Sequence, residues 1–457
     1  MRIATRKPGS AWVRWLVACA FLFVLSTMVI AQNDPGPRGG STGAGGAVSN
    51  LSVKEMKFFL SGADAFEEAA SVSGSVSGTE PGLGPRFNAT SCASCHAHPS
   101  MGGSSPVTNP QVSAAPSSQV NPLIDLGIIS ASGPVREVRF STDGGVHALF
   151  TIAGVSGTPV GCTSVVLKQP DFAAASLAEA LRFRIPTPTF GLGLIEAIPD
   201  ATIEAYAHQL KKFGIAGNTN RNGNDGTVTR YGWKAQNKSL LIFSGEAYNV
   251  EQGITNELFP DERGEGGVAD ASVCRGVVAA PQDSVQYEET QPQRVVDDIN
   301  NFATFMRFLA APVQATSYGI VTADQIAAGE AVFNKAGCNV CHVTSMMTGK
   351  HANAALSGQV VKLFSDLLVH DVGTGDGIQQ GLANGNQFRT APLWGVGQRL
   401  FFLHDGRATN IVDAIHAHGG EATRVINNFN GVSVGEDAPF NLTATERQNL
   451  VYFLRSL

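Results

Sequence analysis

Two short cysteine–histidine runs carry the clearest chemistry in this chain of 457 residues: Cys92-Ala-Ser-Cys95-His96 and Cys338-Asn-Val-Cys341-His342. The spacing Cys-x-x-Cys-His is typical of covalent c-type haem attachment. The two thiols can bond the two vinyl groups of one haem, and the adjacent imidazole can bind the iron. The alternatives are a zinc site, which needs four converging ligands, and a disulfide framework. Neither alternative explains why a histidine follows the second cysteine in both runs. The sequence therefore predicts two covalently bound haem c groups.

The first 31 residues have the features of an export signal. They open with four basic residues and no acidic one, continue with a largely apolar run from Trp15 to Ile30, and end at a small-residue cleavage position, Ala31. This order is typical of a secretory signal peptide over residues 1–31. The alternative is an uncleaved anchor, because 16 apolar residues fall just short of a membrane span. Because c-type haem is attached outside the bacterial cytoplasm, we expect a periplasmic protein with no stable membrane span after cleavage.

The charge of the chain restricts its partners. The formal net charge is −6, and removal of a basic signal would make it more negative. An acidic surface argues against nucleic acid and favours a basic partner. A small redox carrier, such as a cytochrome c or a cupredoxin, is the partner that we expect.

Two of the seven cysteines serve neither the predicted signal nor the haem motifs: Cys162 and Cys274. In an oxidising compartment, two cysteines without another role suggest a disulfide. Two free thiols, or a redox-active pair, are the alternatives, because the sequence does not give the distance between them.

The first Cys-x-x-Cys-His motif lies in the longer of two predicted units of the chain. Residues 32–50 are rich in Gly, Pro and Ser and predict a flexible linker. A helix is expected over 52–70, and alternating apolar residues between 123 and 168 predict a few strands. Apolar residues at helical spacing predict a second long helix over 293–310. We therefore expect an N-terminal haem domain, enlarged by insertions, over residues 51–315.

The second motif lies in a shorter unit, residues 316–457. Thr322 and Gln325 form a capping-box pattern that opens a helix leading to the motif, and Thr443 and Glu446 form another that opens the last helix. An opening helix before the haem motif and a closing helix packed across it make a minimal cytochrome c core. The predicted fold is therefore mainly α, with two cytochrome c-like domains, the first enlarged by loops and a few β-strands.

Several blocks of sequence together resemble one bacterial family: GLGPRFNATSCASCH, GLGLIEAIPDATI, YGWKAQ, LFSDLLVHDVG, FRTAPLWGVG and FLHDGRATNIVDAIHAHGGEA. They are similar to the di-haem oxidoreductases that are labelled thiol oxidoreductases or peroxidases, which are related to the di-haem cytochrome c peroxidases. The matches run from about residue 50 to the C-terminus. The resemblance implies that the C-terminal haem takes electrons from a redox carrier and passes them to the N-terminal haem, which reacts with peroxide or another small oxidant.

The resemblance also implies which residues bind the two irons. His96 and His342 are the expected proximal ligands. In the wider group a distal ligand follows the histidine of a His-x-Gly turn by about 14 residues, and from His404 that position is His418, with His416 as the nearest rival. No distal ligand for the first haem is evident, because His98 is too close to His96; His147 and His208 are weak candidates.

Catalytic and relay residues are implied by looser matches. Glu196, in GLGLIEAIP, resembles the distal glutamate that moves protons between peroxide oxygens, although a surface glutamate at a helix start is the alternative. Trp233 resembles the tryptophan that carries electrons between the haems, with Trp394 as its rival. The resemblance also allows a calcium ion between the domains, for which Asn and Asp side chains within 218–225 offer oxygen ligands.

Two further functions remain open at this point. The same haem pair could oxidise a thiol or a protein side chain, although no residue pattern identifies a thiol site. Alternatively, both irons could be six-coordinate in a non-catalytic di-haem electron carrier.

Overall fold

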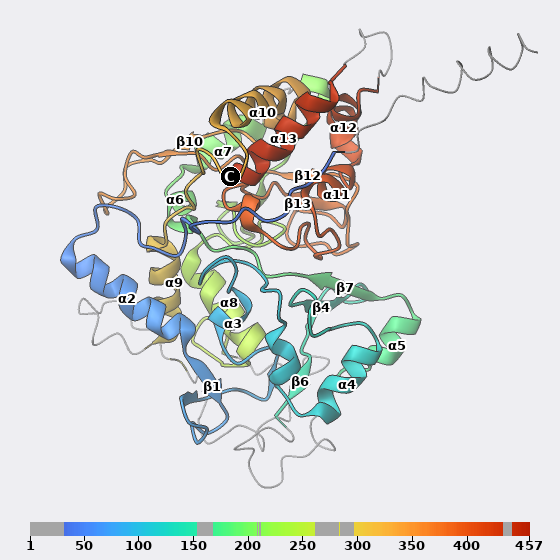
Figure 1. Ribbon diagram of the computed structural model, residues 1–457. Helices are drawn as coiled ribbons and strands as arrows, with labels where there is room; N and C mark the ends of the chain where they lie inside the picture. The colour runs from blue at the N-terminus through green and yellow to red at the C-terminus, as the bar shows by residue number, and fades with distance from the viewer. Residues whose placement is uncertain are drawn as a thin grey trace, which may run out of the picture.

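The computed structural model describes residues 32–152, 168–207, 209, 212–260, 283, 297–432 and 441–457. The predicted signal peptide, His208, Cys162 and Cys274 lie outside these ranges. Among the regular elements of the described chain, helices contain more residues than strands. The elements form two lobes, with most N-terminal elements below and most C-terminal elements above in Figure 1. Within the described ranges, no helix has both the length and the apolar character needed to cross a membrane.

Three helices form the centre of the lower lobe: α2 (Val53–Glu67), α8 (Leu240–Gln252) and α9 (Asp298–Phe308). The first begins at Ser52, whose hydroxyl accepts from the Glu55 amide while the Glu55 carboxylate accepts from the Ser52 amide. Phenylalanines of α2 pack on those of α9, with Phe59 stacked on Phe305 at 5.5 Å between ring centroids. The helices expected over 52–70 and 293–310 are therefore present, with shorter bounds in each case.

The upper lobe has a matching pair, α10 (Ala323–Ala336) and α13 (Ala444–Ser456). Both capping boxes expected from the sequence are confirmed, at Thr322 and at Thr443. The two helices touch closely at Gly329, where an added Cβ would overlap the Asn449 carbonyl oxygen. One turn later Phe333 packs edge-on against Phe453, 5.4 Å between centroids.

The close approach at Gly329 gives a prediction about stability. Gly329→Ala should lower the free energy of unfolding by about 1–3 kcal/mol, because the new methyl group must push the two helices apart. Helix propensity alone would instead raise the free energy of unfolding by about 1 kcal/mol, because alanine favours a helix more than glycine does. The sign of the measured change therefore shows which effect is larger. Urea unfolding measures the difference, with the exposed neighbour Ala328→Ser as control. A stabilised Gly329→Ala protein would contradict the close packing.

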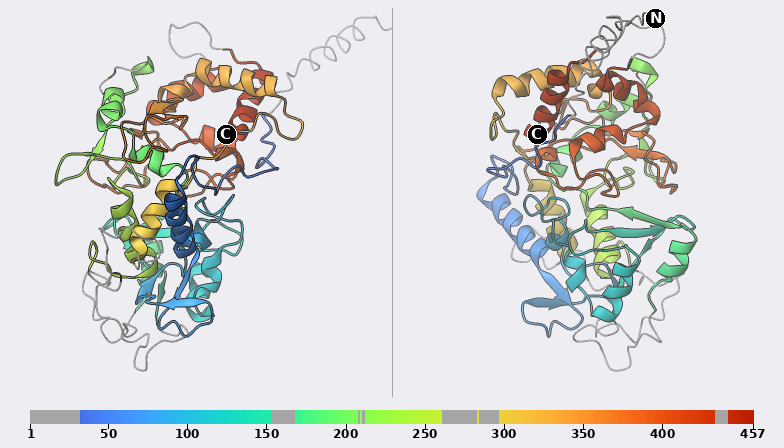
Figure 2. Two further views of the ribbon diagram at one scale, coloured as in Figure 1. Left: turned by 90° about the vertical axis from the view of Figure 1, so that its left-hand side faces the viewer. Right: turned by 45° about the vertical axis from the view of Figure 1, so that its right-hand side comes forward.

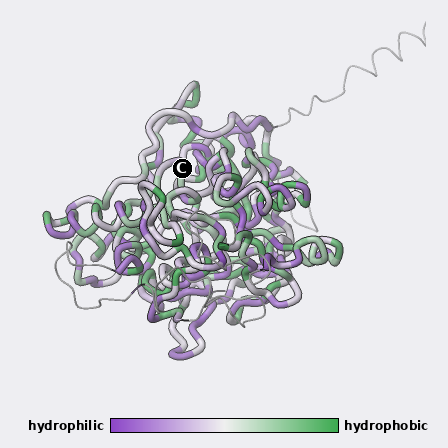
Figure 3. Tube along the Cα trace, turned by 90° about the horizontal axis from the view of Figure 1, so that it is seen from below, coloured by the Kyte–Doolittle hydropathy of each residue, from purple (hydrophilic) through white to green (hydrophobic). Residues whose placement is uncertain are grey.

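The remaining described helices are short: α3 (Cys92–Cys95), α4 (Ser117–Asp125), α5 (Phe172–Leu177), α6 (Leu192–Glu196), α7 (Asp200–Ala207), α11 (Ile411–His416) and α12 (Thr423–Asn430). Five described single turns of 3-10 helix accompany them: η1 (Pro110–Ser113), η2 (Lys212–Gly214), η5 (Cys338–Val340), η6 (Val396–Gln398) and η7 (Gly420–Ala422). These short elements leave long irregular stretches, and apolar and polar segments alternate over short lengths along the trace in Figure 3.

The described strands are short and form small sheets. The largest has the order β5-β4-β7 and is antiparallel, with β4 (Glu137–Phe140) between β5 (Val146–His147) and β7 (Leu181–Arg184). The others pair as β1 (Ala69–Ser71) with β2 (Thr79–Pro81), β3 (Arg86–Phe87) with β6 (Phe150–Thr151), β8 (Asn220–Arg221) with β9 (Val228–Thr229), β10 (Met346–Met347) with β11 (Val360–Val361), and β12 (Val369–Asp371) with β13 (Gln387–Arg389). The strands expected between 123 and 168 are therefore found in part, after the α4 helix.

Residues 32–50 lie along the folded body, which differs from the flexible linker that their composition predicts. The Asp34 carboxylate accepts two hydrogen bonds from the buried guanidinium of Arg455, at 2.7 and 2.6 Å. Farther along, the Arg38 amide bonds the Gly397 carbonyl, and the Val48 amide bonds the Phe308 carbonyl. In Figures 1 and 2 this blue trace runs beside the end of the chain. Specific polar contacts, which composition does not reveal, hold the segment in place.

Two hydrophobic cores correspond roughly to the two lobes. The larger contains buried residues from Val48 to Leu309, and the smaller contains residues from Val321 to Leu457. The two cores do not divide the sequence at one point, because three residues from the C-terminal part of the chain belong to the larger core: Leu356, Leu368 and Trp394. A bridge between Asn218 and Val369 also joins the middle of the chain to the upper lobe.

Candidate functional site

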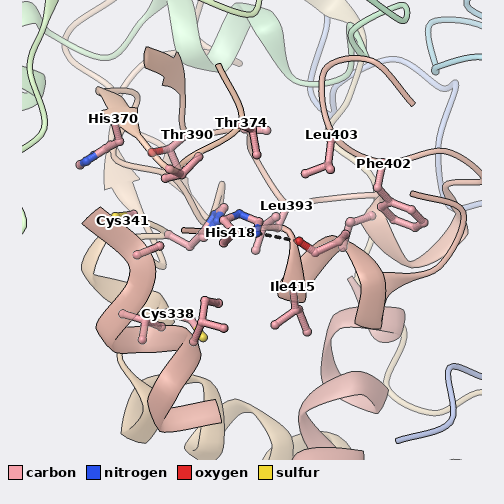
Figure 4. Close-up of a pocket in the computed structure, with 18 of the residues that line it drawn as sticks. Cys338, Cys341, His370, Thr374, Thr390, Leu393, Phe402, Leu403, Ile415 and His418 are labelled. Carbon is pink, nitrogen blue, oxygen red and sulfur yellow. Dashed lines mark hydrogen bonds between the residues drawn. The ribbon is translucent and has the colours of Figure 1, made fainter. Parts of the chain in front are cut away.

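The second cysteine motif lies at one side of a largely apolar cavity in the upper lobe. Helix α10 ends at Gly337, whose φ of 98° turns the chain sharply into η5 and the motif. Cys338, Cys341 and His342 line the cavity, and His418 lines it as well. Figure 4 shows both cysteines and His418 around this space. The four residues that the sequence assigned to the second haem therefore share one cavity.

Two of the four histidines in the described lining of this cavity, His342 and His418, are held in the same way. The Nδ1 atom of His342 lies 2.9 Å from the Phe364 carbonyl oxygen, and the Nδ1 atom of His418 lies 2.7 Å from the Ala414 carbonyl oxygen, the dashed line in Figure 4. Because each Nδ1 is directed at a carbonyl, it carries the proton, and Nε2 keeps its lone pair for a metal. Burial lowers the pKa of His342 to about 4 and also lowers the pKa of His418. Both rings are therefore neutral, which is the form that binds iron.

His416, the rival of His418, does not belong to the described lining of this cavity. Its Nε2 atom lies 3.2 Å from the Asn430 side-chain oxygen, and its ring packs against Phe429. The two-residue offset at the end of α11 separates the two imidazoles, as the sequence predicted.

The first cysteine motif lines a second cavity, in the lower lobe. Helix α3 contains both cysteines and begins at Ser91, whose hydroxyl accepts from the Ser94 amide. The Nδ1 atom of His96 lies 3.0 Å from the Gly103 carbonyl oxygen, and burial lowers its pKa to about 4. His96 is therefore held in the same way as His342 and His418 of the upper cavity. Burial also raises the pKa of Cys95 to about 12, so the thiol remains protonated.

The lower cavity has a more polar lining than the upper one. Its charged and amide groups are Gln111, Arg136, Glu137, Arg139, Arg184, Gln236, Glu246, Glu251 and Gln252. Glu137 is paired with Arg139, and Glu251 accepts from the Asn88 amide at 2.9 Å. Glu246 accepts from the side-chain amide of Asn237. Carboxylates are therefore present in the cavity of the His96 motif.

Glu196, the sequence candidate for proton transfer, is not one of these lining residues. It ends α6 and forms an ion pair with Arg307 of α9, 2.6 Å from Nε to Oε2, and it also accepts from the Leu240 amide. These contacts hold the carboxylate between helices instead of directing it into the cavity. The structure thus places Glu196 outside the described lining of the His96 cavity, and its role in proton transfer stays a prediction. Glu246 and Glu251 of α8, which no sequence motif singles out, line that cavity.

The described lining of the lower cavity contains one histidine, His96, and one methionine, Met306 of α9. Within that lining, no second histidine offers itself as a distal ligand. The histidines named from the sequence as candidate distal ligands have other partners. His98 bonds the Gln398 carbonyl at 2.7 Å, and His147 pairs with Asp143.

Trp233 is the residue that the two cavities share. Its indole N–H donates to the Ile185 carbonyl at 2.9 Å, and its carbonyl accepts from the Arg389 amide at 2.8 Å. Both contacts fix the ring between the cavities, and the indole lies edge-on to His404, 6.4 Å between centroids. Trp394, its rival, lies in the larger core and lines neither cavity.

A stack of side chains continues from Trp233 into a buried charged cluster. His404 stacks on Phe388 at 4.0 Å, and the Lys234 ammonium lies 4.1 Å from the centre of the same phenyl ring. The ammonium is also 3.1 Å from the Asp376 carboxylate, which pairs with Arg184 at 2.7 Å. This network joins β7 to the segment before β13 and rigidifies the region between the cavities.

His370 and the predicted calcium loop have other partners. His370 is buried between Asp366 and Glu421, 3.0 Å from each, and these hydrogen bonds raise its pKa to about 11 despite burial. In the loop over 218–225, the Asp225 carboxylate pairs with Lys238, and Asn220 bonds two carbonyls. A calcium ion in this loop stays a prediction, as does the pairing of Cys162 with Cys274 outside the described residues.

Two separate cavities, each with a Cys-x-x-Cys-His motif, joined by one aromatic side chain, define a protein with two redox centres. The chain belongs to the family described as "di-haem oxidoreductase, putative peroxidase", which matches residues 175–457. Its members bind two haems, so the resemblance in the sequence blocks is confirmed. No curated protein matches the chain.

Three solved structures show distant similarity. The di-haem peroxidase BthA from Burkholderia thailandensis is 14% identical, with 88% of this chain and 85% of that chain covered and a TM-score of 0.35. A MauG-like protein associated with microbial copper homeostasis is 18% identical, with coverage of 60% and 90% and a TM-score of 0.27. Hydrazine synthase of Kuenenia stuttgartiensis is 17% identical, with coverage of 60% and 88% and a TM-score of 0.24. These TM-scores are too low to transfer any property of those proteins to this chain.

The residues of both cavities fit haem c. In each, two cysteines and a buried histidine whose pKa burial lowers to about 4 line one space. The upper cavity adds a second neutral histidine, and the lower cavity adds carboxylates. The two sites therefore differ in the groups that surround the ring.

Proposed function

We propose that the chain is a periplasmic di-haem peroxidase with haem c bonded to Cys92 and Cys95 and to Cys338 and Cys341. Residues 51–315 and 316–457 form its two cytochrome c-like domains. A small redox carrier, a cytochrome c or a cupredoxin, reduces the C-terminal haem, and electrons then pass to the N-terminal haem. The observation that carries this proposal is Trp233, which lines both cavities.

The haem at His96, when bound, supplies an iron centre that accepts a peroxide oxygen. Reduction of one hydrogen peroxide consumes two electrons and two protons and releases two waters, so the oxygen–oxygen bond breaks only if a proton reaches the leaving oxygen. A side chain that moves protons is therefore required in the same cavity.

Glu246 is the residue that we assign to this proton transfer. Glu246 and Glu251 both lie on α8 and line the cavity. Burial raises the pKa of both cysteine thiols and the charge of Glu251 raises it further, so Glu251 is the glutamate that acts on the cysteines. Glu246 lies more than one helical turn away. The Asn237 amide orients its carboxylate, and Gln236 lines the same cavity.

The upper cavity is suited to electron transfer without peroxide chemistry. His342 and His418 offer two neutral imidazoles to one iron, which would fill both axial positions and leave none for peroxide. The described lining of this cavity contains no carboxylate that could deliver a proton. The His342 haem is therefore the electron-entry centre.

Stopped-flow mixing of peroxide with the fully reduced protein tests the proposed function. Both haems should be oxidised within seconds, with two electrons removed for each peroxide. If the reduced protein is stable to peroxide over minutes, the peroxidase assignment is wrong.

The rival function, a non-catalytic electron carrier, differs in its spectra. We expect the ferric protein to show one high-spin and one low-spin haem by EPR, and carbon monoxide to bind one reduced haem. Two low-spin haems that bind no carbon monoxide would instead indicate the carrier.

Trp233→Phe should slow electron transfer between the haems, because phenyl lacks the indole ring system and its hydrogen bond to the Ile185 carbonyl. In stopped-flow experiments with peroxide, oxidation of the low-spin haem should become slower, while the first reaction at the high-spin haem should keep its rate. Trp394→Phe is the matched control, since that indole lines neither cavity. Equal effects of the two substitutions would show that Trp233 is only a packing residue.

A further inference from the structure

The upper cavity contains two buried guanidinium groups and, within its described lining, no acidic side chain. The groups belong to Arg389 and Arg399, whose side chains are 8% and 7% exposed. A buried cation is unfavourable unless an anion or hydrogen-bond acceptors surround it. The lower cavity differs, because its arginines lie among glutamates.

Arg389 finds acceptors in the backbone. Its Nε donates to the Gly232 carbonyl at 3.1 Å, and Nη1 lies 3.5 Å from the Thr390 carbonyl. These contacts also attach β13 to the residue before Trp233. The guanidinium of Arg389 therefore has hydrogen-bond acceptors within the protein for some of its N–H groups.

Arg399 has no such acceptors. Its Nε and Nη2 atoms are buried and have no hydrogen-bond partner, and burial alone lowers its pKa to about 10. Its backbone is firmly held, because its amide bonds the Val396 carbonyl and its carbonyl accepts from Arg455 at 3.3 Å. The structure therefore fixes an arginine in the wall of the cavity and leaves its guanidinium without an anion.

We infer that Arg399 binds a propionate of the haem attached at Cys338 and Cys341, as a buried ion pair. This inference rests on the proposed covalent haem and assigns it a residue that the motifs do not reveal. A haem brings two carboxylates, and a guanidinium can bind a carboxylate through two parallel N–H donors. The largely apolar lining gives this pair a low-dielectric environment, in which the interaction is strong.

The ion pair has a consequence for the potential of this haem. Ferric haem carries one more positive charge than ferrous haem, so a nearby cation favours the ferrous state. The Arg399 guanidinium both adds this cation and neutralises a propionate that would favour the ferric state. Arg399 therefore raises the midpoint potential of the electron-entry haem.

Spectroelectrochemical titration of Arg399→Leu tests the inference. We expect the midpoint potential of the low-spin haem to fall and that of the other haem to stay unchanged, while Arg399→Lys restores most of the wild-type value. Resonance Raman spectra should show a shifted propionate-bending band for one haem only. Lys335→Leu, which removes an exposed cation of the same lobe, is the matched control.

The outcomes separate the inference from the proposed function. Covalent haem is counted first, by pyridine haemochrome, and a wild-type protein without two haems would contradict the proposed function itself. If Arg399→Leu retains two haems with wild-type potentials and an unchanged Raman band, the propionate assignment is wrong. If that variant does not fold, Arg399→Gln decides, because it removes the charge and keeps a polar side chain. An unshifted propionate band and a wild-type potential in the folded Gln variant overturn the inference, and shifts of both support it.

Discussion

Glu246→Gln should slow peroxide reduction by roughly 10²–10⁴-fold, the usual contribution of a positioned acid–base group. Glutamine keeps the size of the side chain and can still accept from the Asn237 amide, so the cavity should keep its shape. It cannot take up and release a proton. Stopped-flow oxidation of the reduced protein by peroxide measures the rate, and electron entry from an artificial reductant should be unaffected.

Glu196→Gln is the matched comparison for this prediction. Its carboxylate pairs with Arg307 outside the cavity, so the substitution should leave the peroxide rate close to the wild-type value. A large loss of rate in Glu196→Gln, with Glu246→Gln near wild type, would restore the assignment that the sequence motif suggests. If only Glu251→Gln slowed the reaction with peroxide, the proton-transfer role would belong to Glu251 instead of Glu246.

His418→Met should raise the midpoint potential of the C-terminal haem by a sizeable part of the roughly 0.8 V range that axial ligands set. A thioether favours ferrous iron more than an imidazole does. The haem should stay low-spin, and electron transfer to the N-terminal haem should become less favourable. Spectroelectrochemical titration measures the potential, and the appearance of a thioether–iron charge-transfer band identifies the new ligand.

His416→Met is the control for the ligand assignment. His416 contacts Asn430 and Phe429 and lies outside the cavity lining, so its replacement should leave the spectrum and the potential unchanged. If His416→Met changed the low-spin spectrum and His418→Met did not, the two residues would exchange roles.

The sequence predicted best where a result depends on spacing along one element. The capping boxes at Thr322 and Thr443 are local patterns, and a helix converts them directly into geometry. The haem ligands at the Cys-x-x-Cys-His runs and at His418 stay predictions, although these residues line two cavities. The family assignment from sequence blocks was also correct.

Prediction was weaker where the result depends on contacts between distant segments. Glu196 sits in a conspicuous motif, but its direction depends on Arg307, which is 111 residues away. Glu246 has no motif, and only the packing of α8 places it in the cavity of His96. The unpaired guanidinium of Arg399 likewise becomes visible only when its surroundings are known.

The ion pair between Asp34 and Arg455 has a consequence for the order in which the protein is assembled. Asn33 and Asp34 lie just after the predicted signal, yet their partners, Gln448 and Arg455, are among the last ten residues of the chain. During synthesis from the N-terminus, this contact cannot form until Arg455 has been made, 421 residues after Asp34. The segment around Asp34 therefore docks late, and the cysteines of the first motif are made long before that contact can form.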